Sequence, residues 1–256
     1  ADKVMVYEPD AMARYSISIN HEREPWKDVR VRKAVDLVFD RQAALKVNGR
    51  GYVGSIFVRP WGMKTEDVLK LPGYRQPKDA DIAEAKRLLA EAGYAQGFKT
   101  TILCQTGGPR EQQAVVIKDQ LAKIGIDAEL VLIEYAILID RAQRGAFDLL
   151  TANWTDNTGD PDETLNTYYH SRASRNYSRF NETEVDALIE KQARTIDETA
   201  RKVILAEIEQ KVTDRVAMVI QFWDVWQIGA WKEVKNFDPG PGLHPWGQYD
   251  QMWLAK

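Results

Sequence analysis

Strand-like and helical segments alternate between residues 98 and 154, and this alternation constrains the fold more than any other feature. The intervening segments 110–125 and 136–145 have helical character, and the first of them ends at Gly125. The strand-like segments are rich in β-branched and apolar residues: "FKTTILCQ" (98–105), "IDAELVLIE" (126–134) and "AFDLLTANW" (146–154). Strands and helices joined in this order by short connections are typical of an α/β layer.

The rest of the chain extends this layer. A strand is predicted at "RYSISIN" (14–20), and a helix follows with Asp28 as its N-cap. A second helix covers 79–94, with a capping-box spacing at Asp81 and Glu84 and a terminating Gly93. Amphipathic helices near 182–196 and 198–214 precede a strand-like tail, "AMVIQFWDVWQIGAW" (217–231). The pattern predicts one α/β body with an added tail.

Charge and composition limit the classes of partner and the locations that the chain can have. The 35 basic and 38 acidic side chains are well mixed, so no nucleic-acid partner is predicted. No apolar run approaches the ~20 residues that span a bilayer, and the first ten residues do not resemble a signal peptide. The chain is therefore either cytoplasmic or a processed or truncated piece. No P-loop or GxGxxG motif is present, so no cofactor is predicted, and the lone Cys104 is expected to be a packed thiol.

The stretch "NWTDNTGDPDETL" (153–165) contains four carboxylates and could hold a metal ion. A helix-loop-helix calcium site starting at Asp156 fails on three positions, which carry Thr158, Pro161 and Thr167 in place of an acid or amide, a glycine and a glutamate. The three histidines, at 21, 170 and 244, have no paired ligand spacing. No metal site is predicted.

Two further functions are open to these carboxylates. Asp156 and Asp160 could flank a glycosidic bond, as a carboxylate-based hydrolase requires, and this is the alternative to a binding function. The structural role is simpler, because Asp160, Pro161 and Glu163 occupy the N-cap, N1 and N3 positions of a helix entering "TLNTYY". We expect Asp160 and Glu163 to cap that helix.

The first half of the stretch lies where a ligand is expected. Trp154 ends a predicted strand, and ligands of open α/β sheets bind beyond the carboxyl ends of the strands. "QTGGPR" (105–110) leaves an earlier strand at the same edge, and Gln105 and Thr106 offer amide and hydroxyl groups there. A flat apolar wall beside a few polar groups suits a small-molecule pocket. Trp154 could equally close over the core.

Six segments, in the same order, resemble one protein family. They are "PWKDVRVRKAVDLVFDR", "AKRLLAEAGY", "IKDQLAKIGIDAELV", "RGAFDLLTANWTDNTGDPDETL", "NYSRFNETEVDALIEKQ" and "ARKVILAEIEQKV". The chain resembles the extracellular solute-binding proteins of family 5, the peptide/nickel/opine type that feeds ABC importers. The resemblance implies a class II-like, venus-flytrap receptor with two lobes, located in the periplasm or anchored outside the membrane. Its implied partners are a small-molecule or peptide ligand and a membrane permease.

The resemblance covers only the second half of the family's length, so we expect a fragment whose N-terminal lobe is missing. It implies a run-in to the lobe crossover at 1–20, the C-terminal ligand-binding lobe at 21–216, and a hinge return with a tail at 217–256. The tail is expected to pack on the missing lobe.

The family's W-x-x-D position implies ligand contacts for this loop. Peptide binders carry an aspartate there that pairs with the ligand's α-amino group, whereas this chain carries Asn157, with Asp156 one residue earlier. An amide lacks the full charge that holds an ammonium, so opines, sugars and modified amino acids stay open as ligands. We expect Trp154 and Asn157 to face the cleft, and the function to be binding without catalysis. Trp154→Ala should then remove affinity and leave the melting temperature nearly unchanged.

Overall fold

A five-stranded sheet forms the centre of the molecule in the computed structural model, which describes residues 3–238 and 249–255. Its strand order is β4-β3-β5-β2-β6, with bounds β2 Asp10–Ile19, β3 Phe98–Gln105, β4 Ile126–Ile133, β5 Leu149–Thr155 and β6 Val219–Val225. Strands β3, β4 and β5 are parallel, whereas β2 pairs antiparallel with both β5 and β6. The α/β layer predicted from the sequence is confirmed.

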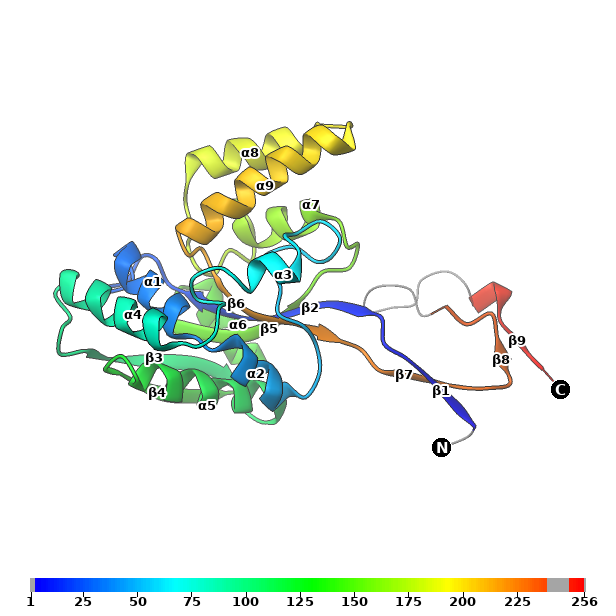
Figure 1. Cartoon of the computed structure of the whole chain (residues 1–256), viewed down its shortest axis with the longest axis horizontal. Coiled ribbons are helices and arrows are strands. Elements are labelled where there is room, and N and C mark those ends of the chain that lie inside the picture. The colour runs from blue at the N-terminus through cyan, green and yellow to red at the C-terminus, as the bar shows by residue number, and fades with distance from the viewer. Residues whose placement is uncertain (1–2, 239–248, 256) are drawn as a thin grey trace.

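Helices cover both faces of the sheet, and each face has its own apolar core (Figure 1). One face packs against α1 Val29–Val38, α2 Arg41–Asn48, α4 Asp79–Glu91 and α5 Gly108–Ala122. The other packs against α6 Tyr135–Gln143, α7 Pro161–Thr164, the π-helical turn η1 Leu165–Tyr169, α8 Thr183–Ala193 and α9 Glu198–Asp214. The short helix α3 Thr65–Val68 lies in the long connection between α2 and α4. Adjacent residues of β3 and β5 therefore enter opposite cores: Ile102 and Leu149 pack in the first, and Leu103 and Leu150 in the second.

Two helix starts show how local chemistry sets the boundaries. Asp28 is the N-cap of α1, and its carboxylate accepts a hydrogen bond from the Arg30 amide at 2.8 Å, as predicted. The capping box predicted in the second helix is wrong, because α4 begins at Asp79, three residues earlier than that spacing requires. Asp81 is instead fully buried and binds the ammonium group of Lys78 at 2.9 Å. A buried cation partner has replaced the helix amides for this carboxylate.

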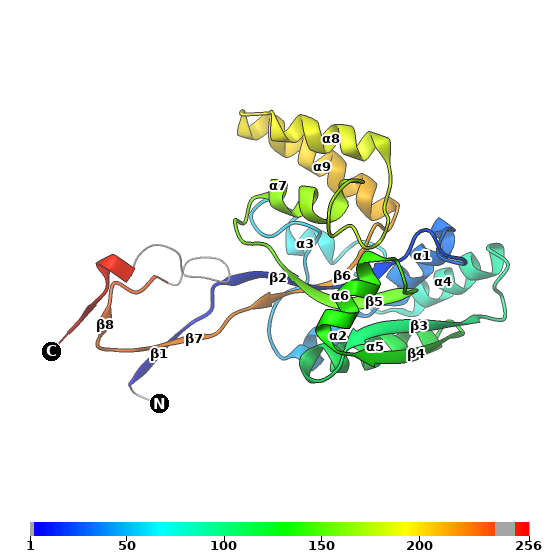
Figure 2. The ribbon, with the colours of Figure 1, turned by 180° about the vertical axis from the view of Figure 1, so that it is seen from behind.

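An arm protrudes from one end of the body (Figure 1 and Figure 2). It consists of the pair β1 Val4–Tyr7 and β7 Ile228–Trp231, followed by β8 Val234–Lys235, the 3₁₀ turn η2 Tyr249–Gln251 and β9 Trp253–Leu254. The pairing of β2 with β6 shifts register twice, between Asp10 and Arg14 and between Tyr15 and Ser16, near the point where β2 enters the sheet. The domain limits at residues 20 and 216 stay a prediction, although the sheet extends beyond both, through β2 and β6.

Candidate ligand-binding site

A polar cluster lies at the edge of the sheet where β3, β4, β5 and β6 have their carboxyl ends. Arg110, in the first turn of α5, donates one hydrogen bond to Gln105 Oε1 at 3.0 Å and another to Asn153 Oδ1 at 3.3 Å. Both partners are neutral amides, and no ion pair joins Arg110 to a carboxylate within the described ranges. Thr106 is exposed beside this cluster. The edge therefore presents a positive charge that is held in place but not neutralised.

A buried ion pair lies under the loop that follows β5. Arg14 Nη1 donates to Asp156 Oδ2 at 2.6 Å, and the two side chains are 0% and 1% exposed. The Thr164 hydroxyl donates to the same oxygen at 2.6 Å, while the Arg14 guanidinium stacks on the Tyr168 ring at 4.4 Å. Burial is the largest influence and lowers the pKa of Arg14, but Asp156, Tyr169 and Tyr168 together outweigh it and raise that pKa, so Arg14 stays charged. Asp156 is thus a fastening point of the loop and not an open ligand group.

Glu163 binds the tip of the same loop. Its carboxylate accepts hydrogen bonds from the backbone amides of Asn157 and Thr158 at 2.8 and 2.7 Å, and from both of their side chains. Burial raises the pKa of Glu163, yet these four hydrogen bonds outweigh it and hold the pKa below its ordinary value. Glu163 reaches back as predicted, but to residues 157 and 158 and not to the Asp160 amide. The Asn157 side chain remains exposed.

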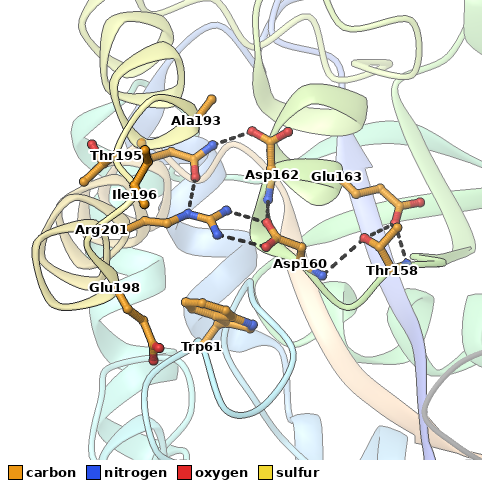
Figure 3. A pocket seen from close by; sticks show the side chains of 11 residues that line it. Trp61, Thr158, Asp160, Asp162, Glu163, Ala193, Thr195, Ile196, Glu198 and Arg201 are labelled. Atoms are coloured by element: carbon orange, nitrogen blue, oxygen red, sulfur yellow. Dashed lines mark hydrogen bonds and ion pairs between the residues drawn. The ribbon is translucent and has the colours of Figure 1, made fainter.

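Asp160 has the predicted capping role and a second one. Its carboxylate accepts from the Asp162 amide at 2.8 Å as the N-cap of α7, and it also forms a two-pronged ion pair with Arg201 of α9. Arg201 lowers the pKa of Asp160. The two residues lie on the wall of a surface pocket of about 670 Å³ between α7, the α8–α9 turn and Trp61 (Figure 3). The Arg201 guanidinium stands over the Trp61 ring, 5.2 Å from its centre.

The expectation for the Trp154 side chain is wrong. The indole is 4% exposed and packs in the core between the sheet and α6 to α9, with its ring centre 5.4 Å from that of Tyr177 and 6.0 Å from that of Tyr168. It shares the strand face with Leu150 and Ala152, which belong to the same core. Tyr168 and Tyr177 cover this face at the end of β5. Trp154 therefore supports the loop from beneath.

The remaining predicted groups have structural positions. Cys104 is buried, and burial raises the pKa of its thiol to about 12.

In the part of the chain that the structure describes, no group of three His, Cys, Asp or Glu side chains could hold a metal ion. His244 lies outside the described residues. No helix within those residues has the length and apolar character of a membrane span.

Sequence comparison identifies the family. The description "Bacterial extracellular solute-binding proteins, family 5 Middle" matches residues 1–176. The chain belongs to the bacterial extracellular solute-binding proteins of family 5. It is 28% identical over 209 residues to Di/tripeptide-binding protein 1 of Pseudomonas aeruginosa, a match covering 78% of this chain and 38% of that protein. It is 30% identical over 223 residues to the periplasmic oligopeptide-binding protein OppA of Escherichia coli, a match covering 84% of this chain and 40% of that protein. These family 5 relatives are named as binding proteins.

Solved structures show the same fold over a single lobe. HbpA2 from Haemophilus parasuis superposes with a TM-score of 0.82 and 26% identity, covering 99% of this chain and 50% of that one. The periplasmic binding protein DppA from Helicobacter pylori, in complex with the peptide STSA, superposes with a TM-score of 0.81 and 22% identity. The match covers 100% of this chain and 50% of that one. This family 5 chain therefore spans about half the length of the structures that it matches, and 38% and 40% of the two curated relatives.

Two residues of this candidate site were not predicted from the sequence. Arg110 ends the "QTGGPR" segment that was predicted to lie at the ligand edge, but nothing in the sequence shows that its partners are the amides of Gln105 and Asn153. Arg14 is separated by 142 positions from Asp156, so no local pattern connects them. An arginine in a strand-like apolar run was the one available signal, since a buried cation usually has a partner.

Proposed function

We propose that this chain is the C-terminal lobe of a two-lobed substrate-binding protein. The whole protein captures a small polar solute outside the cytoplasmic membrane and delivers it to the permease of an ABC importer. The observation that carries the proposal is the membership in family 5, together with a fold that covers one half of its structural neighbours. The relatives' names point to short peptides or peptide-like solutes.

The arm supports a missing partner lobe. Val6, Trp231 and Leu254 are 63%, 60% and 72% exposed, although all three are large apolar residues on strands. Exposed apolar groups of this size are costly in water and usually belong to an interface. A second lobe packed on the arm would cover them and place its own surface opposite the polar edge of this lobe.

Arg110 is the group that we assign to the ligand. An arginine that is held by two amides, and that has no carboxylate partner among the described residues, is ready to bind an anionic group in two-pronged fashion. Thr106, Gln105 and Asn157 lie at the same edge and can supply directional hydrogen bonds. Asn157 carries no charge and is already bonded to Glu163, so this lobe holds a carboxylate more firmly than an ammonium. Solutes with a free carboxylate, including peptides and opines, fit this edge.

The test uses the full-length protein with both lobes, purified without denaturation. Native mass spectrometry identifies the retained solute, and calorimetry then compares that solute with its amidated analogue. Arg110→Met should lower the affinity for the carboxylate form at least about tenfold and leave that for the amide nearly unchanged. Arg141→Met is the control, because the Arg141 side chain donates to the Ala146 carbonyl and forms no ion pair with the residues that the structure describes. Equal losses for both solutes would remove Arg110 from the ligand, and turnover that depends on Asp156 would favour the hydrolase alternative.

The isolated lobe gives an independent test. A single lobe leaves one side of the ligand in water, so its hydrogen bonds gain little over those to solvent. We expect this 256-residue chain to bind the same solute far more weakly than the two-lobed protein. Micromolar affinity in the isolated chain, measured by calorimetry, would contradict the two-lobed mechanism.

A further inference from the structure

A second cavity lies away from the polar edge. Its volume is about 940 Å³, and its walls come from α1, α4, α9 and the connection that carries α3. Helices α1 and α4 stand at the end of the molecule opposite the arm in both views (Figure 1 and Figure 2). This cavity is therefore distinct from the edge at which Arg110 lies, and its size is within the range of small-molecule sites.

Two polar side chains on the cavity wall are buried without complete partners. Glu209 of α9 and Ser55 are each 7% exposed. Within the described ranges, Glu209 Oε1 and Ser55 Oγ form no hydrogen bond. Burial raises the pKa of Glu209; the Ser55 hydroxyl and the Met63 amide lie near enough to lower it in part, but neither completes a bond to Oε1. A carboxylate left in this way is costly for the fold.

The cations around the cavity do not neutralise Glu209. Arg87 pairs with Glu84 and Glu91 at the surface, and Arg75 pairs with Asp81. Lys33 is exposed on α1 and forms no ion pair with the residues that the structure describes. The charged side chains lining the cavity are three bases, at 33, 75 and 87, and four acids, at 36, 84, 209 and 214. Glu209 is the one among these acids that is buried, so a counter-charge for it would have to lie inside the cavity.

Part of the cavity wall is apolar. Leu37, Met63, Val68, Leu71 and Leu88 line the cavity together with Glu209. A ligand that fits must therefore offer a positive hydrogen-bond donor at one end and hydrocarbon along its length. An ammonium group satisfies the first need and an alkyl or aryl body the second.

We propose that this cavity binds a primary amine with an apolar body, whose ammonium group pairs with Glu209. The site lies outside the cleft that the proposed transport function uses. It needs only this lobe, so it is testable in the 256-residue chain whether or not the transport proposal holds.

The probe pair is 2-phenylethylamine and 2-phenylethanol, which differ in the charged group and have the same aryl body. Calorimetry or ligand-observed NMR measures both against the intact chain. We expect Glu209→Gln to lower the affinity for the amine at least about tenfold and to change that for the alcohol less than about twofold. Glu207→Gln is the matched control, because Glu207 lies on the same helix, is half exposed and pairs with Lys211. It should leave both affinities unchanged.

A steric variant tests the location independently. Leu88→Trp adds bulk to the cavity wall and should abolish binding of both probes, even if Glu209→Gln fails to fold. The proposal would be overturned by no binding of the amine to the wild-type chain, by equal affinity for amine and alcohol, or by binding that survives in both Glu209→Gln and Leu88→Trp. Loss of amine binding in Glu207→Gln as well would also overturn it, since the effect would then come from overall charge.

Discussion

The loop after β5 and the cavity beside α9 each contain a buried carboxylate, but among the described residues only one of them has a buried counter-charge. Asp156 and Glu209 both keep one oxygen that accepts no hydrogen bond from the described part of the chain. Asp156 nevertheless has Arg14 at 2.6 Å, whereas Arg75 and Arg87, which line the cavity with Glu209, pair with other carboxylates. Removing Arg14 would therefore strand the Asp156 carboxylate, whereas Glu209 already lacks a buried cation and is the group that we propose pairs with a ligand.

The largest expected effect tests whether Trp154 stabilises the fold or contacts the ligand. Because Trp154 is buried among Tyr168 and Tyr177, Trp154→Ala should lower the free energy of unfolding by about 3–5 kcal/mol. Urea unfolding of the chain measures this. Trp231→Ala, on the exposed arm, is the control and should change it by less than about 0.5 kcal/mol. An unchanged stability with lost solute affinity in the two-lobed protein would restore Trp154 as a ligand residue.

The next effect tests the counter-charge itself. Arg14→Met removes the cation and leaves the Asp156 carboxylate buried without a partner, which should cost about 3 kcal/mol of unfolding free energy. Adding Asp156→Leu to this variant removes the stranded charge and should recover part of the loss. If the double variant is less stable than Arg14→Met alone, the ion pair is not what makes Asp156 important to the loop.

A smaller effect is expected where the carboxylate is partly exposed. Asp160→Ala removes the N-cap of α7 and the ion pair to Arg201, and should cost about 0.5–2 kcal/mol. Asp140→Ala is the comparison, because Asp140 is half exposed and pairs with Arg144 on one helix. It should cost less than about 0.5 kcal/mol. Equal costs in the two variants would show that the cap contributes nothing.

The smallest effect has the opposite sign and depends on pH. The pKa of Glu209 in the folded chain is raised above its unfolded value, so the wild type is fully stable only below the unfolded pKa and loses stability as pH rises through the folded pKa. Glu209→Gln avoids this loss. We expect it to be more stable than the wild type at pH 7 by on the order of 0.5 kcal/mol, and the gain to vanish near pH 4. A gain that does not change with pH would mean that Glu209 is already compensated.

The sequence predicted most of the sheet and its helices, because apolar periodicity and terminating glycines are local signals. Strand β3 was predicted with the bounds that the structure has, and α9 with the same C-terminal residue. The predicted alternation along β5 also placed Trp154 on the face of Leu150 and Ala152. It could not show that this face is covered at the strand's end, since the tyrosines that cover it follow 14 and 23 positions later.

The partners of charged groups were beyond sequence reasoning for the same reason. Asp81 had the spacing of a helix cap, yet Lys78 binds it. Asp156 resembled a ligand or catalytic group until its partner 142 positions away was placed beside it. Glu209 is one polar residue on an amphipathic helix, and only the packing of α1, α4 and α9 shows that it is buried. Burial and pairing are properties of the assembled layers, which no single segment contains.

The two register shifts between β2 and β6 have a mechanical consequence. An irregular pair of strands has fewer aligned backbone hydrogen bonds and bends more readily than a regular ladder. These shifts lie at the root of the arm, where only two neighbouring strands leave the body. A two-stranded ribbon is flexible across its flat face and stiff within its plane. A domain attached to the arm would therefore rotate about one axis, while the five-stranded sheet behind it stays rigid.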